Sequence, residues 1–183
     1  MRCAVDVAPL RREPADDAEQ VTQVLRGEEL RVEEERGGWA RVVTAYDYPG
    51  WIRVDALVPG AGDPLVRQFD SPLDAARSFL GAPYLWGGMT RAGIDCSGLV
   101  HMAYRLCGRL VVRDSWQQEA AGEPVSEPKP GDLVTYGGEA ADHIAFWLGD
   151  RRILHSTGRE GLGVVEELEP QSLMERRRSV IRL

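Results

Sequence analysis

The chain has 183 residues, of which 43% are hydrophobic and 28% charged, and these proportions are those of a folded globular protein. Its formal net charge of −7 argues against a nucleic-acid partner, which would require a basic face, and we expect the short run Arg176–Arg178 to be a solvated edge. No apolar stretch approaches the ~20 residues of a membrane span, so no membrane partner is expected. The three cysteines form no close C-x-x-C pair, which argues against a disulfide framework and a structural metal.

The N-terminus does not resemble a signal peptide, because Arg2 and Asp6 interrupt its only apolar run. We therefore expect the chain to act in the cytoplasm. A chain whose leader had been removed would show the same N-terminus, so secretion stays open as the alternative.

The first part of the chain is expected to form a small antiparallel β-barrel over residues 1–60. Short apolar runs separated by glycine-containing turns lie at residues 21–25, 30–32, 39–43 and 50–54. This spacing is typical of small barrels. Trp39 and Trp51 are expected in the barrel core.

A stretch rich in proline and glycine, Pro59–Pro64, indicates a linker, which we place at residues 61–71, before a second domain at residues 72–183. Ser71 and Pro72 have the chemistry of an N-cap and a first-turn proline, so a helix is expected from there to about Leu80.

A second helix is expected from Cys96 to Cys107, with Asp95 as its N-cap and an apolar face that includes Cys107. Backbone N–H groups and the helix dipole at the first turn favour a thiolate at Cys96, and the polar and glycine neighbours argue against burial there. Cys107 is expected in the core. His101 lies roughly 140° round the helix from Cys96 and is expected at the surface.

Strands are expected at residues 133–136 and 164–166, the latter as the final strand, and in a hairpin whose arms are residues 143–148 and 153–155. His143 and His155 are equally distant from residue 149, the expected turn, so they should be directly opposed on one face. Two such histidines, together with a cysteine at a helix start, indicate nucleophilic catalysis.

Several spaced motifs resemble the NlpC-type family of papain-like cysteine peptidases over roughly residues 72–168. They are GAPYLWGG at residues 81–88, GIDCSGLV at 93–100, PGDL at 130–133, HIA at 143–145, and His155. The resemblance implies an α+β fold with helices packed on an antiparallel sheet, and the first domain resembles the bacterial Src-homology-3-type barrel. In the family pattern Cys96 is the nucleophile, His143 the base and His155 the third polar residue of the site.

What the resemblance implies for function is an endopeptidase that cuts between γ-D-Glu and a diamino acid in murein peptides, without a metal or cofactor. Backbone N–H groups near the helix start would stabilise the oxyanion. Tyr84 would lie at the edge of the site, and Asp95 and Ser97 would line the substrate cleft.

The segment Tyr48–Ile52 resembles the YkfC-like subgroup, in which a barrel tyrosine and an acid help the counterpart of Asp95 bind the free amine of an N-terminal L-Ala. Tyr48 matches the tyrosine best, Tyr46 second, and Glu13 is the candidate acid. The small peptide L-Ala-γ-D-Glu-diamino acid is then the expected partner.

Three alternatives stay open at this point. They are a secreted peptidoglycan hydrolase, an amidase or acyltransferase of the same fold, and a non-catalytic wall-binding module. The sequence does not specify the diamino acid or the oligomeric state.

Overall fold

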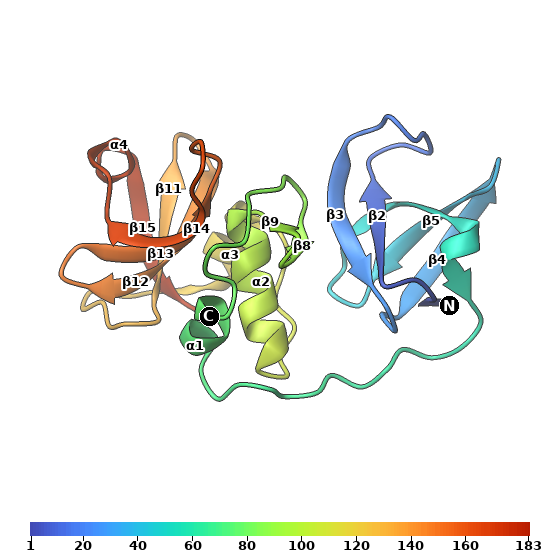
Figure 1. The fold of residues 1–183 in the computed structure, drawn as a ribbon, viewed down its shortest axis with the longest axis horizontal. Coiled ribbons are helices and arrows are strands. Elements are labelled where there is room, and N and C mark those ends of the chain that lie inside the picture. Colours follow the sequence, from blue (N-terminus) through green and yellow to red (C-terminus); the bar gives the residue numbers. More distant parts are fainter. The chain divides into compact units, whose positions relative to one another are not determined.

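The computed structural model describes all 183 residues and divides them into two compact units (Figure 1). The first, the barrel unit, comprises Met1–Pro64 and Trp86–Met89, and the second, the sheet unit, comprises Leu65–Leu85 and Thr90–Leu183. The sequence-based division did not anticipate that Trp86–Met89, beyond the expected linker, would group with the barrel.

The barrel unit contains a five-stranded antiparallel sheet of order β3-β2-β6-β5-β4 and a short β1–β7 pair (Figure 1). A single 3₁₀ turn, η1 (Val54–Ala56), precedes β7. The strands are β1 (Arg2–Cys3), β2 (Val7–Arg11), β3 (Gln20–Leu25), β4 (Leu30–Arg36), β5 (Trp39–Thr44), β6 (Pro49–Arg53) and β7 (Leu57–Val58). Alternating residues of these strands form one apolar core that includes Leu10, Val24, Val42 and Ile52.

Trp39 and Trp51 are buried, as predicted, with 5% and 8% of their surfaces exposed. Each lies beneath a guanidinium group, that of Arg53 over Trp39 at 4.3 Å and that of Arg36 over Trp51 at 4.7 Å. The arginines therefore cover the two indoles from solvent by cation–π contact.

The sheet unit is built on a six-stranded antiparallel sheet of order β10-β15-β11-β12-β13-β14 (Figure 1). Its strands are β10 (Glu123–Pro124), β11 (Leu133–Gly137), β12 (Ala141–Gly149), β13 (Arg152–Thr157), β14 (Gly163–Leu168) and β15 (Arg177–Arg182). A small β8–β9 pair (Met89–Thr90 and Gly93–Ile94) lies outside this sheet. The expected final strand is β14, and the prediction missed β15, which pairs with β11.

Four helices accompany the sheet: α1 (Pro72–Arg77), α2 (Cys96–Leu106), α3 (Ser115–Ala121) and α4 (Gln171–Met174). The Ser71 hydroxyl caps α1 as predicted, accepting from the Asp74 N–H at 3.4 Å, but this helix ends before Leu80. Helix α2 packs against β12 and β13, which confirms the predicted α+β class of helices on an antiparallel sheet. No helix is both long and apolar enough to cross a membrane.

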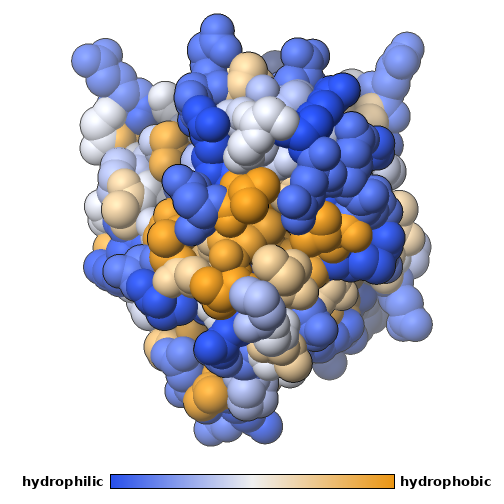
Figure 2. Space-filling view, turned by 90° about the vertical axis from the view of Figure 1, so that its right-hand side faces the viewer, coloured by the Kyte–Doolittle hydropathy of each residue, from blue (hydrophilic) through white to orange (hydrophobic).

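Figure 2 shows an apolar patch on one face, bordered by hydrophilic residues. Large apolar side chains exposed in the barrel unit include Val5, Val7 and Val58. Exposed apolar side chains of this kind are common on folded proteins and identify no site by themselves.

Candidate active site

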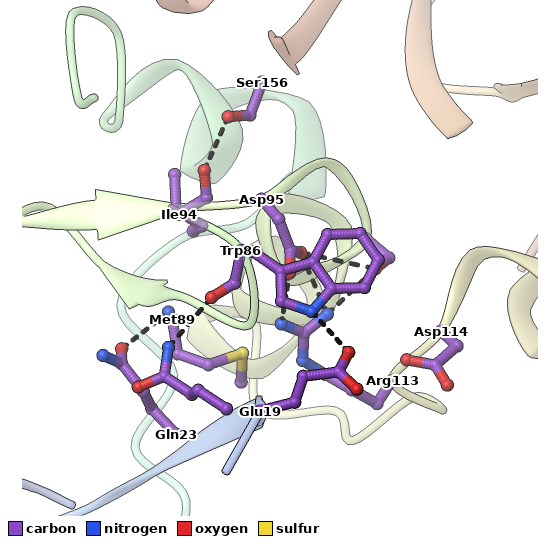
Figure 3. Close-up of polar contacts among 12 residues, drawn as sticks. Glu19, Gln23, Trp86, Met89, Ile94, Asp95, Arg113, Asp114 and Ser156 are labelled. Atoms are coloured by element: carbon purple, nitrogen blue, oxygen red, sulfur yellow. Dashed lines mark hydrogen bonds and ion pairs between the residues drawn. The ribbon is translucent and has the colours of Figure 1, made fainter. Parts of the chain in front are cut away.

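The start of α2 is held by close backbone contacts of β9. The N–H of Ile94 donates to the Pro83 carbonyl at 3.0 Å, and its carbonyl accepts from the Leu85 N–H at 3.3 Å and from the Ser156 hydroxyl at 2.6 Å (Figure 3). A Cβ at Gly93 would lie 2.5 Å from the Leu85 Cβ. Glycine is therefore required at residue 93 so that the backbone can pass close to Leu85. The chain then continues directly into the start of α2.

Asp95 caps α2 as predicted, accepting from the Gly98 N–H at 2.6 Å. Arg113 donates to both of its carboxylate oxygens, at 3.0 and 2.8 Å, and to the Ser97 hydroxyl at 2.9 Å (Figure 3). The side chains of Arg113 and Asp95 are only 1% and 9% exposed, so this is a buried, bidentate ion pair. The sequence interpretation missed Arg113.

Helix α3, which the sequence interpretation also missed, holds the Arg113 segment against α2. The Gln118 side chain donates to the carbonyls of Ser97 and Val112 at 3.0 and 2.9 Å. A capping box between Asp114 and Gln117 begins the helix, and this D-x-x-Q pattern is the sequence feature from which α3 could have been found.

Cys96 lies in the first turn of α2 as predicted, but it is buried, with 7% of its surface exposed. Burial raises the pKa of its thiol to about 12, and the Asp95 carboxylate adds to the rise. The backbone N–H groups of Ile144 and Ser97 lower the pKa by less than burial raises it. The expectation that Cys96 would not be buried is therefore wrong, and its burial favours the neutral thiol.

His143 and His155 share one face of the sheet as predicted, but they are not directly opposed. The hairpin turns at Asp150 and Arg151, which have φ of 48° and 58°, and an irregularity between Trp147 and Gly149 shifts the register. The pairing of Phe146 with Leu154 places His155 opposite residue 145, so the two histidines are diagonal neighbours.

A continuous chain of hydrogen bonds crosses three strands from this pair. Nε2 of His143 lies 2.7 Å from Nδ1 of His155, and Nε2 of His155 lies 2.8 Å from Oε1 of Glu167 on β14. Arg159 pairs with the same carboxylate oxygen. The sequence interpretation missed Glu167, although the spacing of 12 residues from His143 to His155 recurs from His155 to Glu167.

Both histidines are neutral near pH 7. Burial lowers the pKa of His143 to about 3, and the neighbouring His155 contributes. Burial lowers the pKa of His155 to about 4, with a contribution from Arg159. The Cys96 thiol lies at the backbone of Ile144, the residue after His143, without a hydrogen bond to the His143 ring. Such contacts are often loose without substrate and tighten when it binds.

Tyr84 lies near the start of α2. It pairs with Ile94 through a backbone bridge, and its ring is half-buried. Burial, with the nearby Cys96 as a smaller cause, raises the pKa of its phenol to about 12. Tyr84 is therefore a hydrogen-bond donor at neutral pH.

Two predictions about α2 are wrong. His101 is fully buried rather than at the surface, because the segment Val111–Val112 covers that side of the helix and its backbone interacts with the ring. Cys107 is half-buried rather than in the core, because α2 ends at Leu106 and Cys107 is its C-cap.

The two barrel residues of the predicted site, Tyr48 and Glu13, belong to the other unit. Tyr48 is half-buried just before β6, packs on the barrel core, and its ring lies 6.4 Å from that of the buried Tyr46. Glu13 is exposed between β2 and β3. Their predicted roles in amine binding stay predictions.

Three hydrogen bonds join the segment Trp86–Met89 to residues 19–23 within the barrel unit. The Trp86 indole N–H donates to Glu19 at 3.0 Å, the Gln20 amide donates to the Trp86 carbonyl at 2.9 Å, and the Met89 N–H donates to Gln23 at 2.9 Å (Figure 3). The motif that the sequence interpretation assigned wholly to the second domain is thus divided after Leu85.

Comparisons with known proteins match both parts of the chain to known families. A model of the NlpC/P60 family matches residues 81–181, and a model of the bacterial dipeptidyl-peptidase Sh3 domain matches residues 10–57. The gamma-D-glutamyl-L-lysine dipeptidyl-peptidase of Bacillus subtilis is 36% identical over 125 residues, which cover 58% of this chain and 41% of that protein. The Bacillus cereus protein of the same name is 34% identical over 128 residues, 66% of this chain and 38% of its own length. The chain thus spans about two fifths of these relatives.

Solved structures show the same architecture. A Bacillus cereus NlpC/P60 family protein aligns over 99% of this chain and 62% of its own, with a TM-score of 0.59 and 24% identity, which shows the fold alone. The peptidoglycan hydrolase RipB of Mycobacterium tuberculosis aligns over 61% of this chain and 62% of its own, with a TM-score of 0.54 and 32% identity. Since the family model spans the helix-start cysteine and both strand histidines, more than half of the chain, this protein belongs to the NlpC/P60 family.

Proposed function

We propose that this protein is a cysteine peptidase that cleaves the bond between γ-D-Glu and a diamino acid in murein peptides with a free N-terminal L-Ala. The observation that carries the proposal is the thiol of Cys96 at a helix start, in contact with the backbone of Ile144, which directly follows His143 in the hydrogen-bonded chain of His143, His155 and Glu167. This is the arrangement of nucleophile, base and orienting groups that acyl transfer from a peptide requires.

The reaction begins from a neutral thiol. Sγ of Cys96 attacks the γ-carbonyl carbon while its proton moves to Nδ1 of His143, the ring nitrogen that His155 does not occupy. The backbone N–H groups of the first turn of α2, which have no intrahelical partner, lie near the developing oxyanion.

The tetrahedral intermediate then breaks its C–N bond, and the His143 imidazolium gives its proton to the leaving amine. A thioester remains on Cys96. His143 next takes a proton from water, which attacks the thioester, and the imidazolium returns that proton to the departing Sγ. The cycle ends with the free thiol and a γ-carboxylate.

The names of the two Bacillus relatives support the choice of bond, because a dipeptidyl-peptidase releases a dipeptide from a free N-terminus. Tyr48, Glu13 and Asp95 are the proposed contacts of the ammonium group. Asp95 already pairs with Arg113, so a substrate amine would share this carboxylate with the guanidinium. We assign Ser97 and Tyr84 to the substrate cleft on the same proposal.

We place the protein in the recycling of murein peptides in the cytoplasm. Released tripeptides carry a free L-Ala amine, whereas in the intact wall this nitrogen is in amide linkage. The second candidate is a secreted wall hydrolase, and it is favoured by the similarity to peptidoglycan endopeptidase RipB, which is 37% identical over 47% of this chain.

The test compares four substrates under equal conditions: L-Ala-γ-D-Glu-meso-diaminopimelate, the L-Lys analogue, the N-acetylated tripeptide and purified sacculi. We expect release of L-Ala-D-Glu from a free tripeptide, identified by mass, and a loss of at least ~100-fold in kcat/KM on acetylation, because the acetyl group removes the positive charge that the proposed contacts bind and adds bulk. Tyr48→Phe and Glu13→Gln should weaken only the free-amine substrates. Comparable cleavage of sacculi would establish the wall hydrolase instead, and no cleavage of any substrate would refute the peptidase.

A further inference from the structure

Glu167 is the last member of the hydrogen-bonded chain and takes part in none of the proton transfers of the proposed reaction. Its carboxylate oxygen lies 2.8 Å from Nε2 of His155, whose side chain is 1% exposed, while its own side chain is 22% exposed. A carboxylate can only accept hydrogen bonds, so Nε2 of His155 must carry a proton. In the neutral ring Nδ1 is then an acceptor.

The protonation of His155 also determines which nitrogen of His143 carries a proton. Nδ1 of His155 lies 2.7 Å from Nε2 of His143, and since Nδ1 accepts, Nε2 of His143 must donate. The neutral ring of His143 is thereby left with its lone pair on Nδ1, the nitrogen free to act on the thiol. The opposite tautomers would place a hydrogen on Nδ1 of His143 and remove the base.

We propose that Glu167 is a positioning residue that makes His143 a base by fixing the tautomers of both histidines, and that Arg159 keeps His155 singly protonated by pairing with Glu167. This proposal rests on the peptidase function, but the tautomers can be measured without turnover. Glu167 contacts His155 and Arg159 and not the thiol, so it acts on the thiol only through His155.

Arg159 is needed because an unbalanced carboxylate would favour the charged form of His155. A doubly protonated His155 would donate from Nδ1, and His143 would then have to accept at Nε2. The Arg159 guanidinium, bound to the same oxygen of Glu167, opposes that second proton. Other charged groups that face the pair are Asp142 and Arg176, which are paired with each other.

The first experiment is ¹⁵N NMR of the histidine rings at pH 7 in the whole chain. The protein has three histidines, and His101→Gln identifies the signals of the third. We expect His143 and His155 both protonated on Nε2 only. In Glu167→Leu the His155 signal should show Nδ1 protonation in whole or in part. A wild-type His155 protonated on Nδ1, or on both nitrogens, would overturn the proposal.

The second experiment is kinetic. Glu167→Leu should lose about 10–100-fold in kcat/KM with KM little changed, the range seen when the hydrogen-bond partner of a metal-bound histidine is removed. Glu167→Gln retains an oxygen that accepts from Nε2 and should stay within ~10-fold of wild type. The matched control is Glu166→Gln, the adjacent acid on β14, whose partner is Arg77 at 2.7 Å. Equal losses in Glu167→Leu and the control, or no rescue by glutamine, would contradict the proposal.

The pH profile separates positioning from a structural role. Removing the positive charge in Arg159→Met should move the acid limb of kcat/KM to higher pH by about one unit, and removing the negative charge in Glu167→Gln should move it to lower pH. Arg152→Met is the control, since Arg152 lies 3.9 Å from Glu166 rather than at Glu167. Shifts in the same direction, or none, would refute the role of the pair.

Discussion

His155 lies one diagonal step from His143 across the β12–β13 ladder, with Nδ1 of the former 2.7 Å from Nε2 of the latter. The irregularity between Trp147 and Gly149 produces this offset. A long or aromatic side chain can reach across to the neighbouring strand, to the residue two positions from the one directly opposite. The two imidazoles meet here edge to face, with ring centroids 5.0 Å apart. The diagonal geometry lets one ring donate in line to the next.

Replacing Cys96 should abolish turnover without unfolding the protein. We expect Cys96→Ala to reduce kcat by at least a factor of about a thousand, because a catalytic triad without its nucleophile keeps only its binding contributions. The measurement is tripeptide cleavage together with thermal unfolding. Cys107→Ala is the matched control: it is a half-buried C-cap residue, so it should retain full activity and lose less than ~1 kcal/mol of stability. Turnover by Cys96→Ala would refute the proposed nucleophile.

The two histidines should differ in the severity of their loss. His143→Ala removes the group that moves the proton and should be nearly inactive, whereas His155→Asn can still accept from Nε2 of His143 and should keep partial activity. Single-turnover rates on the free tripeptide measure the difference. A milder effect at His143 than at His155 would reverse the assigned roles.

Activity should persist into mildly acid solution. The base must be neutral, and burial lowers the pKa of His143 to about 3 and that of His155 to about 4. A lowered pKa means that protonation, and with it loss of the base, sets in only well below pH 6.5. We therefore expect the acid limb of the kcat/KM profile below pH 5.5, and a limb at pH 6.5 or above would contradict the buried, neutral pair.

Removing one partner of the buried ion pair between Arg113 and Asp95 should destabilise the protein. We expect Arg113→Met to lower the free energy of unfolding by about 3–5 kcal/mol, because it leaves a carboxylate with 9% exposure without its countercharge. Combining it with Asp95→Asn should recover part of the loss. Asp6→Asn, which breaks an ion pair in which Asp6 is 89% exposed, is the control and should change stability by less than ~0.5 kcal/mol in urea titrations. Equal effects at the two sites would argue against a buried pair.

His101 should make the protein less stable in acid. Burial lowers its pKa to about 3. The unfolded chain therefore binds a proton at His101 near pH 6.5, whereas the folded chain binds it only at much lower pH. Stability contributed by the neutral ring is present above pH 6.5 and is lost as pH falls, by about 2 kcal/mol at pH 5. His101→Gln should reduce the difference in unfolding free energy between pH 7 and pH 5 by that amount. An unchanged difference would show that His101 titrates normally.

Local patterns in the sequence were enough to predict four of the seven barrel strands (β3 to β6), the caps at Ser71 and Asp95, and the position of Cys96 at a helix start. Each depends on residues within one or two turns of one another, because propensity, capping and alternation are short-range effects. The α+β class followed from the resemblance to the family that the motifs carry.

Only the tertiary structure decided the charge state and the partners of the site. Cys96 has the neighbours of an activated thiolate, yet burial by segments far along the chain makes it a neutral thiol. Arg113 and Glu167 are ordinary charged residues in the sequence and become the partners of Asp95 and His155 through packing across 18 and 12 residues. Desolvation and long-range pairing depend on the whole fold, and a strand's register depends on a single irregularity, so neither could be read from local pattern.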